Sequence, residues 1–364
     1  MEKDKIVEEL RAKLGDSPEE NDKFLKAEGE KFAKEGNIEG VNAVGELLLE
    51  LMPESKKNEI KHLTHIDGIR LDLYHQKIVD LLEDKKALQA LPLAEKLYKK
   101  IILDYAPTET SKFVSLRNPF EDNLCQTLFK DDRVLNRTPF DFSAFITTYA
   151  FLLVETGSNI DAIPILEKAI EYNPVDVAPR FELCEVYKLI RNKRMVLEVT
   201  RDTLKIASSP VAIARCYANV GYTLMDYADF DDAGVFYTAS MMFAPNPAIP
   251  LEMKHLTDLK GSTIIRPTQQ QIINTMKKYD IEFGPSKTVI EVAAYLSSYY
   301  MTKKDIPNAL NALKLTYNLT RDDNIKSLIL KLDPNAAQVR PSGSGAAPVS
   351  NEKAAENRGN ITKS

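Results

Sequence analysis

Residues 143–176 carry the stretch that decides the fold: SAFITTYAFLLVETGSNIDAIPILEKAIEYNPVD. Apolar side chains recur in it at intervals of three and four residues, which is the period of an amphipathic α-helix. Gly157 interrupts this pattern and Pro174 ends it, so the stretch predicts two helices joined by a turn. The small residues Ala150 and Ala162 stand at its positions 8 and 20, where two antiparallel helices would approach each other closely.

The same arrangement recurs along the chain at a period of about 34 residues. Residues 214–247 have Gly221 and Ala233 at positions 8 and 20, and Pro245 at position 32. Residues 177–210 fill the gap between these two units with a weaker match. Three further helix pairs are expected from partial matches, the last with a longer turn between its helices: 290–322, 21–53 and 75–107. Repetition at a constant period predicts an array in which each pair of helices packs on the next.

This spacing of small and large residues resembles the tetratricopeptide repeat (TPR) superfamily, of the cytoplasmic bacterial type. The tryptophan that the family often has at position 4 is absent, because the chain contains no Trp. The resemblance implies an all-α fold, a right-handed α-solenoid of helix-turn-helix pairs. It also implies a protein that binds other proteins or peptides on the concave face of the array.

Four segments follow from the pattern. Residues 1–120 are expected to form a degenerate TPR-like block, 121–142 an irregular connector, and 143–335 the main solenoid. Within the solenoid, 248–289 has weak periodicity and is either an extra helix pair or an insertion. Residues 341–364 contain no aromatic residue and few apolar ones, so they bury too little surface to offset the entropy of ordering and are expected to be disordered.

The composition excludes several classes of protein. The 364 residues are 44% hydrophobic with a formal net charge of −5, which disfavours nucleic-acid binding. We expect no membrane segment and a cytoplasmic location, because apolar runs are short and the amino terminus is charged. The acidic excess lies in residues 1–110, with 18 basic and 24 acidic side chains. A solvated helical surface is the preferred interpretation of this excess, and a docking face for a basic partner is the alternative.

Patterns typical of catalysis or metal binding are not found in the sequence. His62, His65 and His75 lie near one another, but they lack an HExxH spacing or a cysteine partner, so no metal site is expected. Three widely spaced cysteines predict core packing rather than disulfides or nucleophiles: Cys125, Cys184 and Cys216. We therefore expect no catalytic residue, no enzyme activity and no cofactor.

The resemblance implies that the first helix of each pair lines the concave face. The residues expected there are Phe151, Phe181, Glu185, Arg215, Asn219, Tyr222 and Tyr295. Aromatic rings supply contact area, and asparagine and arginine can bind a peptide backbone or a carboxylate. The predicted function is a non-enzymatic scaffold for a protein or peptide partner whose identity is open, as is the oligomeric state.

Two alternatives to this function remain open. The first is a regulatory TPR protein that senses a short peptide, although no effector domain is evident at either end. The second is an enzyme with an unrecognised site in the amino-terminal block, near His62 and His65.

Overall fold

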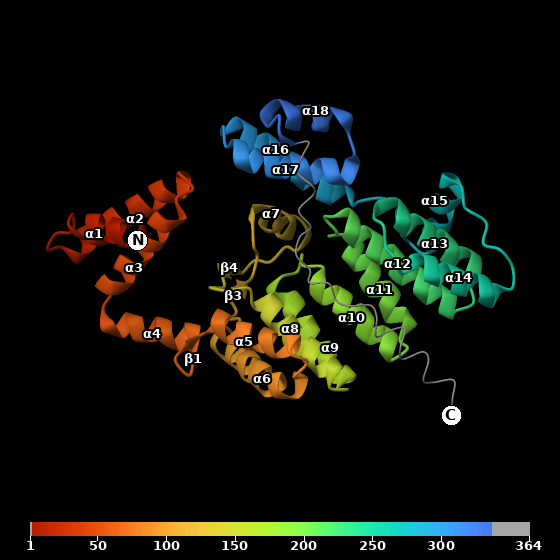
Figure 1. Ribbon diagram of the computed structural model, residues 1–364, viewed down its shortest axis with the longest axis horizontal. Coiled ribbons are helices and arrows are strands. Elements are labelled where there is room, and N and C mark those ends of the chain that lie inside the picture. The colour runs from red at the N-terminus through yellow and green to blue at the C-terminus, as the bar shows by residue number, and fades with distance from the viewer. Residues whose placement is uncertain (1, 337–364) are drawn as a thin grey trace. The chain divides into compact units, whose positions relative to one another are not determined.

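The computed structural model describes residues 2–336, which are predominantly helical (Figure 1). The chain divides into two compact units, of which the first ends at Tyr74 and the second begins at His75. The predicted all-α class is confirmed, because helix-turn-helix pairs occur in both units and the strands are few and short. The predicted tail, 341–364, lies outside the described residues. Within the described part, no helix is both long and apolar enough to cross a membrane.

The first unit is a small helical bundle that ends in a short hairpin. Its elements are α1 (Glu2–Arg11), α2 (Pro18–Lys34), α3 (Ile38–Leu51), α4 (Glu54–Thr64), β1 (His65–Ile66) and β2 (Ile69–Arg70). Helices α1 and α2 pack on α3, and Leu10, Leu25 and Leu47 are buried in the core that the three helices share. Ser17 and Asn37 begin α2 and α3 by accepting hydrogen bonds from backbone amides of the first turn.

The second unit begins within α5 and contains the longer run of helix pairs. Its elements are α5 (Leu71–Glu83), α6 (Ala87–Asp104), β3 (Ser111–Val114), α7 (Pro119–Leu128), β4 (Val134–Arg137), α8 (Phe142–Glu155), α9 (Asn159–Tyr172), α10 (Ala178–Leu189), α11 (Lys193–Leu204), α12 (Pro210–Asp226), α13 (Phe230–Phe243), α14 (Ile249–Lys260), α15 (Gln269–Lys278), α16 (Lys287–Thr302), α17 (Ile306–Thr320) and α18 (Asp323–Leu332). From α8 to α14 each helix packs on the next one in the chain. This order is the array that the repeat predicts.

All six predicted helix pairs have the same three-residue turn. Its middle residue has a positive φ in every pair: Gly36, Lys85, Gly157, Arg191, Ala228 and Lys304. The third residue of each turn donates its backbone N–H to the carbonyl five residues earlier, over 2.8–3.0 Å. This Schellman bond satisfies a carbonyl that the end of a helix would otherwise leave unpaired. The longer turn expected in the pair at 75–107 is not found, because that repeat begins four residues earlier, at Leu71.

Small residues allow the paired helices to approach closely, as predicted. Ala150 of α8 and Ala162 of α9 are fully buried in the same core cluster. In the pair α12–α13, a Cβ added to Gly221 would lie 3.0 Å from the ring of Tyr237, so only a hydrogen fits there. The positions that the repeat reserves for small residues are therefore buried between the helices, and at Gly221 a larger side chain would crowd the facing ring.

Residues 108–142 are more regular than expected. Strands β3 and β4 pair in parallel, and α7 connects them, so regular structure extends into the segment predicted as an irregular connector. Arg117 fastens this β-α-β segment to the array, because its guanidinium reaches Asp141 at 2.6 Å and Asp176 at 2.5 Å. The boundary predicted near 108–142 lies inside the second unit.

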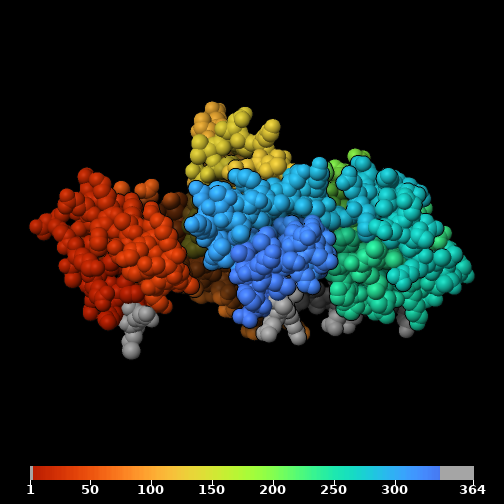
Figure 2. Space-filling view, turned by 90° about the horizontal axis from the view of Figure 1, so that it is seen from above, coloured from red at the N-terminus to blue at the C-terminus, as the bar shows by residue number. Residues whose placement is uncertain are grey.

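The array does not continue in sequence order after α14. Helices α14 and α15 both pack on α13, and α16 then contacts α7, far away in the sequence. Figures 1 and 2 show α16–α18 (blue) beside the yellow segment that contains α7. The loop that leads to α16 is held by Tyr217, whose hydroxyl accepts from Gly284 N at 2.8 Å and donates to the carbonyl oxygen of Glu282 at 3.1 Å. Residues 248–289 thus contain two further helices, α14 and α15, which both pack on α13. After them the chain turns back, and α16 contacts α7.

Candidate functional site

Five of the seven residues predicted for the concave face lie together on α10 and α12. We call their group the α10–α12 cluster and define it as Phe181, Glu182, Glu185 and Lys188 from α10 with Arg215, Asn219 and Tyr222 from α12. Spacings of three and four residues place each set on one face of its helix. The first helices of two successive repeats therefore face each other through polar and aromatic side chains.

Arg215 is held against α10 by a ring and two carboxylates. Its guanidinium carbon lies 4.4 Å from the centre of the Phe181 ring, and one of its nitrogens lies 3.7 Å from Glu185 and 3.9 Å from Glu182. Burial raises the pKa of Glu182, and the charge of Arg215 opposes this shift. The side chain of Arg215 is 33% exposed, so a ligand can still reach its outer edge.

Lys188 is the most buried charge of the cluster, with 14% of its side chain exposed. Its ammonium donates to Glu185 at 2.9 Å and to Asn219 Oδ1 at 2.7 Å, and it lies 5.1 Å from the centre of the Tyr222 ring. Burial acts to raise the pKa of Glu185, but Lys188 and Arg215 outweigh it, and the net shift is downward. The cluster therefore keeps its charges paired internally.

Asn219 has a donor that the described residues leave unpaired. An ammonium can only donate, so the atom of Asn219 that faces Lys188 is its oxygen. Its amide nitrogen Nδ2 is buried and has no hydrogen-bond partner within residues 2–336. The whole residue is only 4% exposed. An unpaired buried donor costs about 1–3 kcal/mol, which an incoming acceptor would recover.

The other two predicted residues do not belong to this cluster. Phe151 lies half-buried on α8. Tyr295 lies on α16, the helix that packs on α7, and is 59% exposed. It lines a separate shallow pocket of about 310 Å³ with Asn123, Thr127, Thr288, Glu291 and Val292. Because α16 returns to α7 instead of following α13, a position counted along the repeat does not place Tyr295 beside Tyr222.

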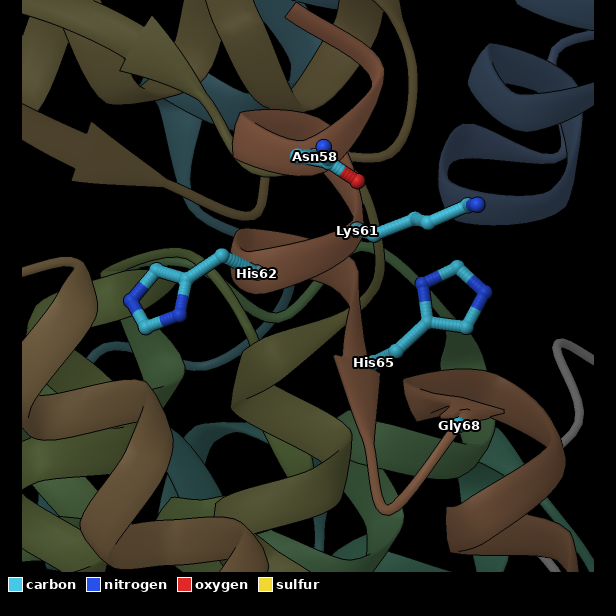
Figure 3. A pocket seen from close by; sticks show the side chains of 5 residues that line it. All are labelled: Asn58, Lys61, His62, His65 and Gly68. Carbon is cyan, nitrogen blue, oxygen red and sulfur yellow. The ribbon is translucent and has the colours of Figure 1, made fainter. Parts of the chain in front are cut away.

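The three histidines that are close in the sequence are divided between the two units. His62 and His65 line an open pocket of about 460 Å³ in the first unit, together with Asn58, Lys61 and Gly68. Figure 3 shows that the ring of His62 points away from the ring of His65 and from the amine of Lys61. His75 belongs to the second unit, where its ring stacks on Phe145 at 4.2 Å. Among the described residues, no group of three or more His, Cys, Asp or Glu side chains could hold a metal ion.

The cysteines are buried, as expected for core residues. Burial raises the pKa of Cys184 to about 11 and raises that of Cys216 well above its ordinary value. Because the thiolate is the reactive form, these thiols are poor nucleophiles near neutral pH.

Comparison with known proteins gives little beyond this geometry. No protein-family model matches the chain, and no curated protein matches its sequence. The C-terminal part of a TPR repeat-containing protein from Cytophaga hutchinsonii is 14% identical; the match covers 82% of this chain and 97% of that chain, with a TM-score of 0.34. Human IFIT1, solved as a dimer with PPP-AAAA, is also 14% identical. The match covers 88% of this chain and 79% of the IFIT1 chain, with a TM-score of 0.29. The assignment of the fold rests on the helix pairs themselves.

Proposed function

We propose that the protein is a non-enzymatic scaffold that binds an extended segment of another protein across the α10–α12 cluster. The observation that carries the proposal is the unpaired Nδ2 of Asn219, buried beside aromatic and charged side chains. A main-chain carbonyl of a bound segment is the acceptor that this donor lacks. Tyr222 and Phe181 supply apolar contact area next to it.

The charges of the cluster favour a polypeptide over a nucleic acid. Lys188 and Arg215 are balanced by Glu182 and Glu185, so no free cation is left in the cluster for a phosphate. The chain as a whole carries a formal charge of −5. Binding through backbone hydrogen bonds and ring contacts should therefore depend only weakly on salt.

A peptide selection tests this function. A random peptide library is panned on the immobilised full-length protein, and the affinity of each enriched peptide is measured by fluorescence anisotropy. We expect Asn219→Ala with Tyr222→Ala to weaken these peptides by tenfold or more, about 1.4 kcal/mol. Amide hydrogen exchange on the complex should show protection in α10 and α12.

Tyr227→Ala provides the matched control. Tyr227 also lies under a lysine ammonium, that of Lys193 at 4.3 Å, but it stands in the turn after α12 and outside the cluster. The control variant should bind as tightly as the unchanged protein. Equal affinity for the double variant, with its helical circular dichroism intact, would show that the binding site lies elsewhere.

A further inference from the structure

Helix α3 of the first unit is apolar on two sides, and the other helices of that unit cover only one of them. Ala43, Val44 and Leu47 are buried in the core that α3 shares with α1 and α2. A second set of residues follows one line along the helix at intervals of three and four, and we call it the outer stripe: Ile38, Val41, Gly45 and Leu49. Ile38 is 73% exposed, Val41 40% and Leu49 50%. A contiguous line of exposed apolar side chains on a helix often marks an interaction site.

Gly45 lies in the middle of the outer stripe, where its presence does not serve the packing of the first unit. A Cβ added there would meet no atom within 4 Å, in contrast to Gly40, whose added Cβ would lie 2.4 Å from the ring of Phe32. Glycine inside a helix is less favourable than alanine, because it loses more conformational freedom on folding. At Gly45 it leaves a notch in the stripe through which the backbone of another helix can approach closely.

The charge around the outer stripe is acidic. Helix α3 contains Glu39, Glu46 and Glu50 and no basic residue, and all three fall on the same side of the stripe. Residues 1–74 hold 12 basic and 18 acidic side chains, a net of −6, so the first unit accounts for the whole acidic excess of the chain. This charge repels a second copy of the same unit and attracts a cationic partner.

We infer that the outer stripe of α3 is a docking surface for an amphipathic helix of a partner protein, whose apolar face is flanked by lysine or arginine. The stripe spans about 17 Å, or three turns, which suits one short helix laid along it. Glu46 is paired with Lys3 and Glu50 with Arg11, but both pairs are exposed and solvent-screened, so a cationic partner can exchange with them. This surface is independent of the α10–α12 cluster.

Two synthetic helical peptides of about 20 residues test the inference on the full-length protein. Both have the same leucine and alanine stripe, flanked by lysines in one and by glutamates in the other. Fluorescence anisotropy should show that the lysine peptide binds at least about tenfold more tightly, with an affinity that falls as salt is added. Val41→Gln and Leu49→Gln should each weaken the lysine peptide severalfold. The matched control is Ile160→Gln in the second unit, where an isoleucine is 71% exposed, and it should change nothing.

Gly45→Ala separates binding from folding. The variant should melt at a higher temperature, because alanine is the better helix former, and yet bind the lysine peptide more weakly, because the methyl group fills the notch. Equal binding of the two peptides, or unchanged binding in Val41→Gln and Leu49→Gln, would overturn the inference. A concentration-dependent dimer that Leu49→Gln abolishes, seen by sedimentation, would overturn it as well, since a second copy would then occupy the stripe.

Discussion

The hydroxyl of Ser240 donates a 2.7 Å hydrogen bond to the backbone carbonyl of Ala214, and so joins the two helices of the pair α12–α13. Ser143 makes the corresponding link in the pair α8–α9, where it donates to the carbonyl of Ala169 over 3.0 Å. Both bonds connect position 1 of the repeat with position 27, but the serine stands at position 27 in one pair and at position 1 in the other. The repeat thus keeps the contact while the residue that supplies the donor changes.

Ser240→Ala should destabilise the protein by about 1 kcal/mol, because the hydroxyl is buried and its bond spans two helices. Urea unfolding followed by circular dichroism measures the change. Ser298→Ala is the control, since Ser298 is exposed on α16, and it should alter the free energy of unfolding by less than about 0.5 kcal/mol. Equal effects of the two substitutions would mean that the bond between the helices contributes nothing measurable.

The shared turn predicts opposite effects of glycine and alanine. Ala228 has a φ of 63° and should gain about 0.5–1 kcal/mol of stability on change to glycine, because glycine tolerates this conformation without strain. Gly157 has a φ of 90°, so Gly157→Ala should cost about 1 kcal/mol or more. Thermal unfolding of the two variants tests whether Ala228→Gly raises the melting temperature and Gly157→Ala lowers it. A stabilising Gly157→Ala would contradict the left-handed turn.

Gly221→Ala tests the close contact between α12 and α13. The added methyl group would lie 3.0 Å from two atoms of the Tyr237 ring, which is itself fully buried and cannot move aside easily. We expect a loss of about 1–3 kcal/mol in the free energy of unfolding. Gly45→Ala makes the same chemical change where there is open space, and there we expect a gain in stability because alanine is the better helix former. An equal change in both variants would show that the contact with Tyr237 contributes nothing measurable.

The stability of the protein should fall in mild acid because of His75. Burial lowers the pKa of His75 to about 4, although the charge of Asp141 opposes the shift, and its Nε2 lies 2.9 Å from the hydroxyl of Thr148. Between pH 6.5 and 4 the unfolded chain takes up a proton that the folded protein does not, so the free energy of unfolding falls as the pH falls. The loss reaches roughly 3 kcal/mol at most and stops below pH 4.

His75→Gln removes this titration and should flatten the pH dependence of urea unfolding between pH 6.5 and 4. The exposed His255 serves as the control, and His255→Gln should leave the dependence as it is. An unchanged slope in His75→Gln would show that the acid sensitivity arises from other groups.

Local pattern was sufficient to predict the helix pairs. Ala150 and Ala162 are buried in the same core cluster, and the units 143–176, 177–210 and 214–247 each correspond to one helix pair, although α12 begins before 214, at Pro210. The register at 75–107 was predicted four residues late, because an alanine occurs at two successive turns of α6, Ala90 and Ala94, and both are buried. Periodicity alone cannot decide which of the two alanines stands at position 20 of the repeat. The left-handed turn residue Lys85 decides it, because in the three units above that residue stands at position 15, which places Ala90 at position 20.

Within 143–247 the sequence by itself determined which residues lie on each helix face and where the turns fall, because these depend on neighbours three or four residues away. It also grouped Arg215, Asn219 and Tyr222 on one side of α12. The tertiary structure alone decided that α16 returns to α7, which separates Tyr295 from that group, and that Lys188 takes the oxygen of Asn219 and leaves its nitrogen unpaired. These features depend on contacts between segments far apart in the chain, which a repeat of short period does not specify.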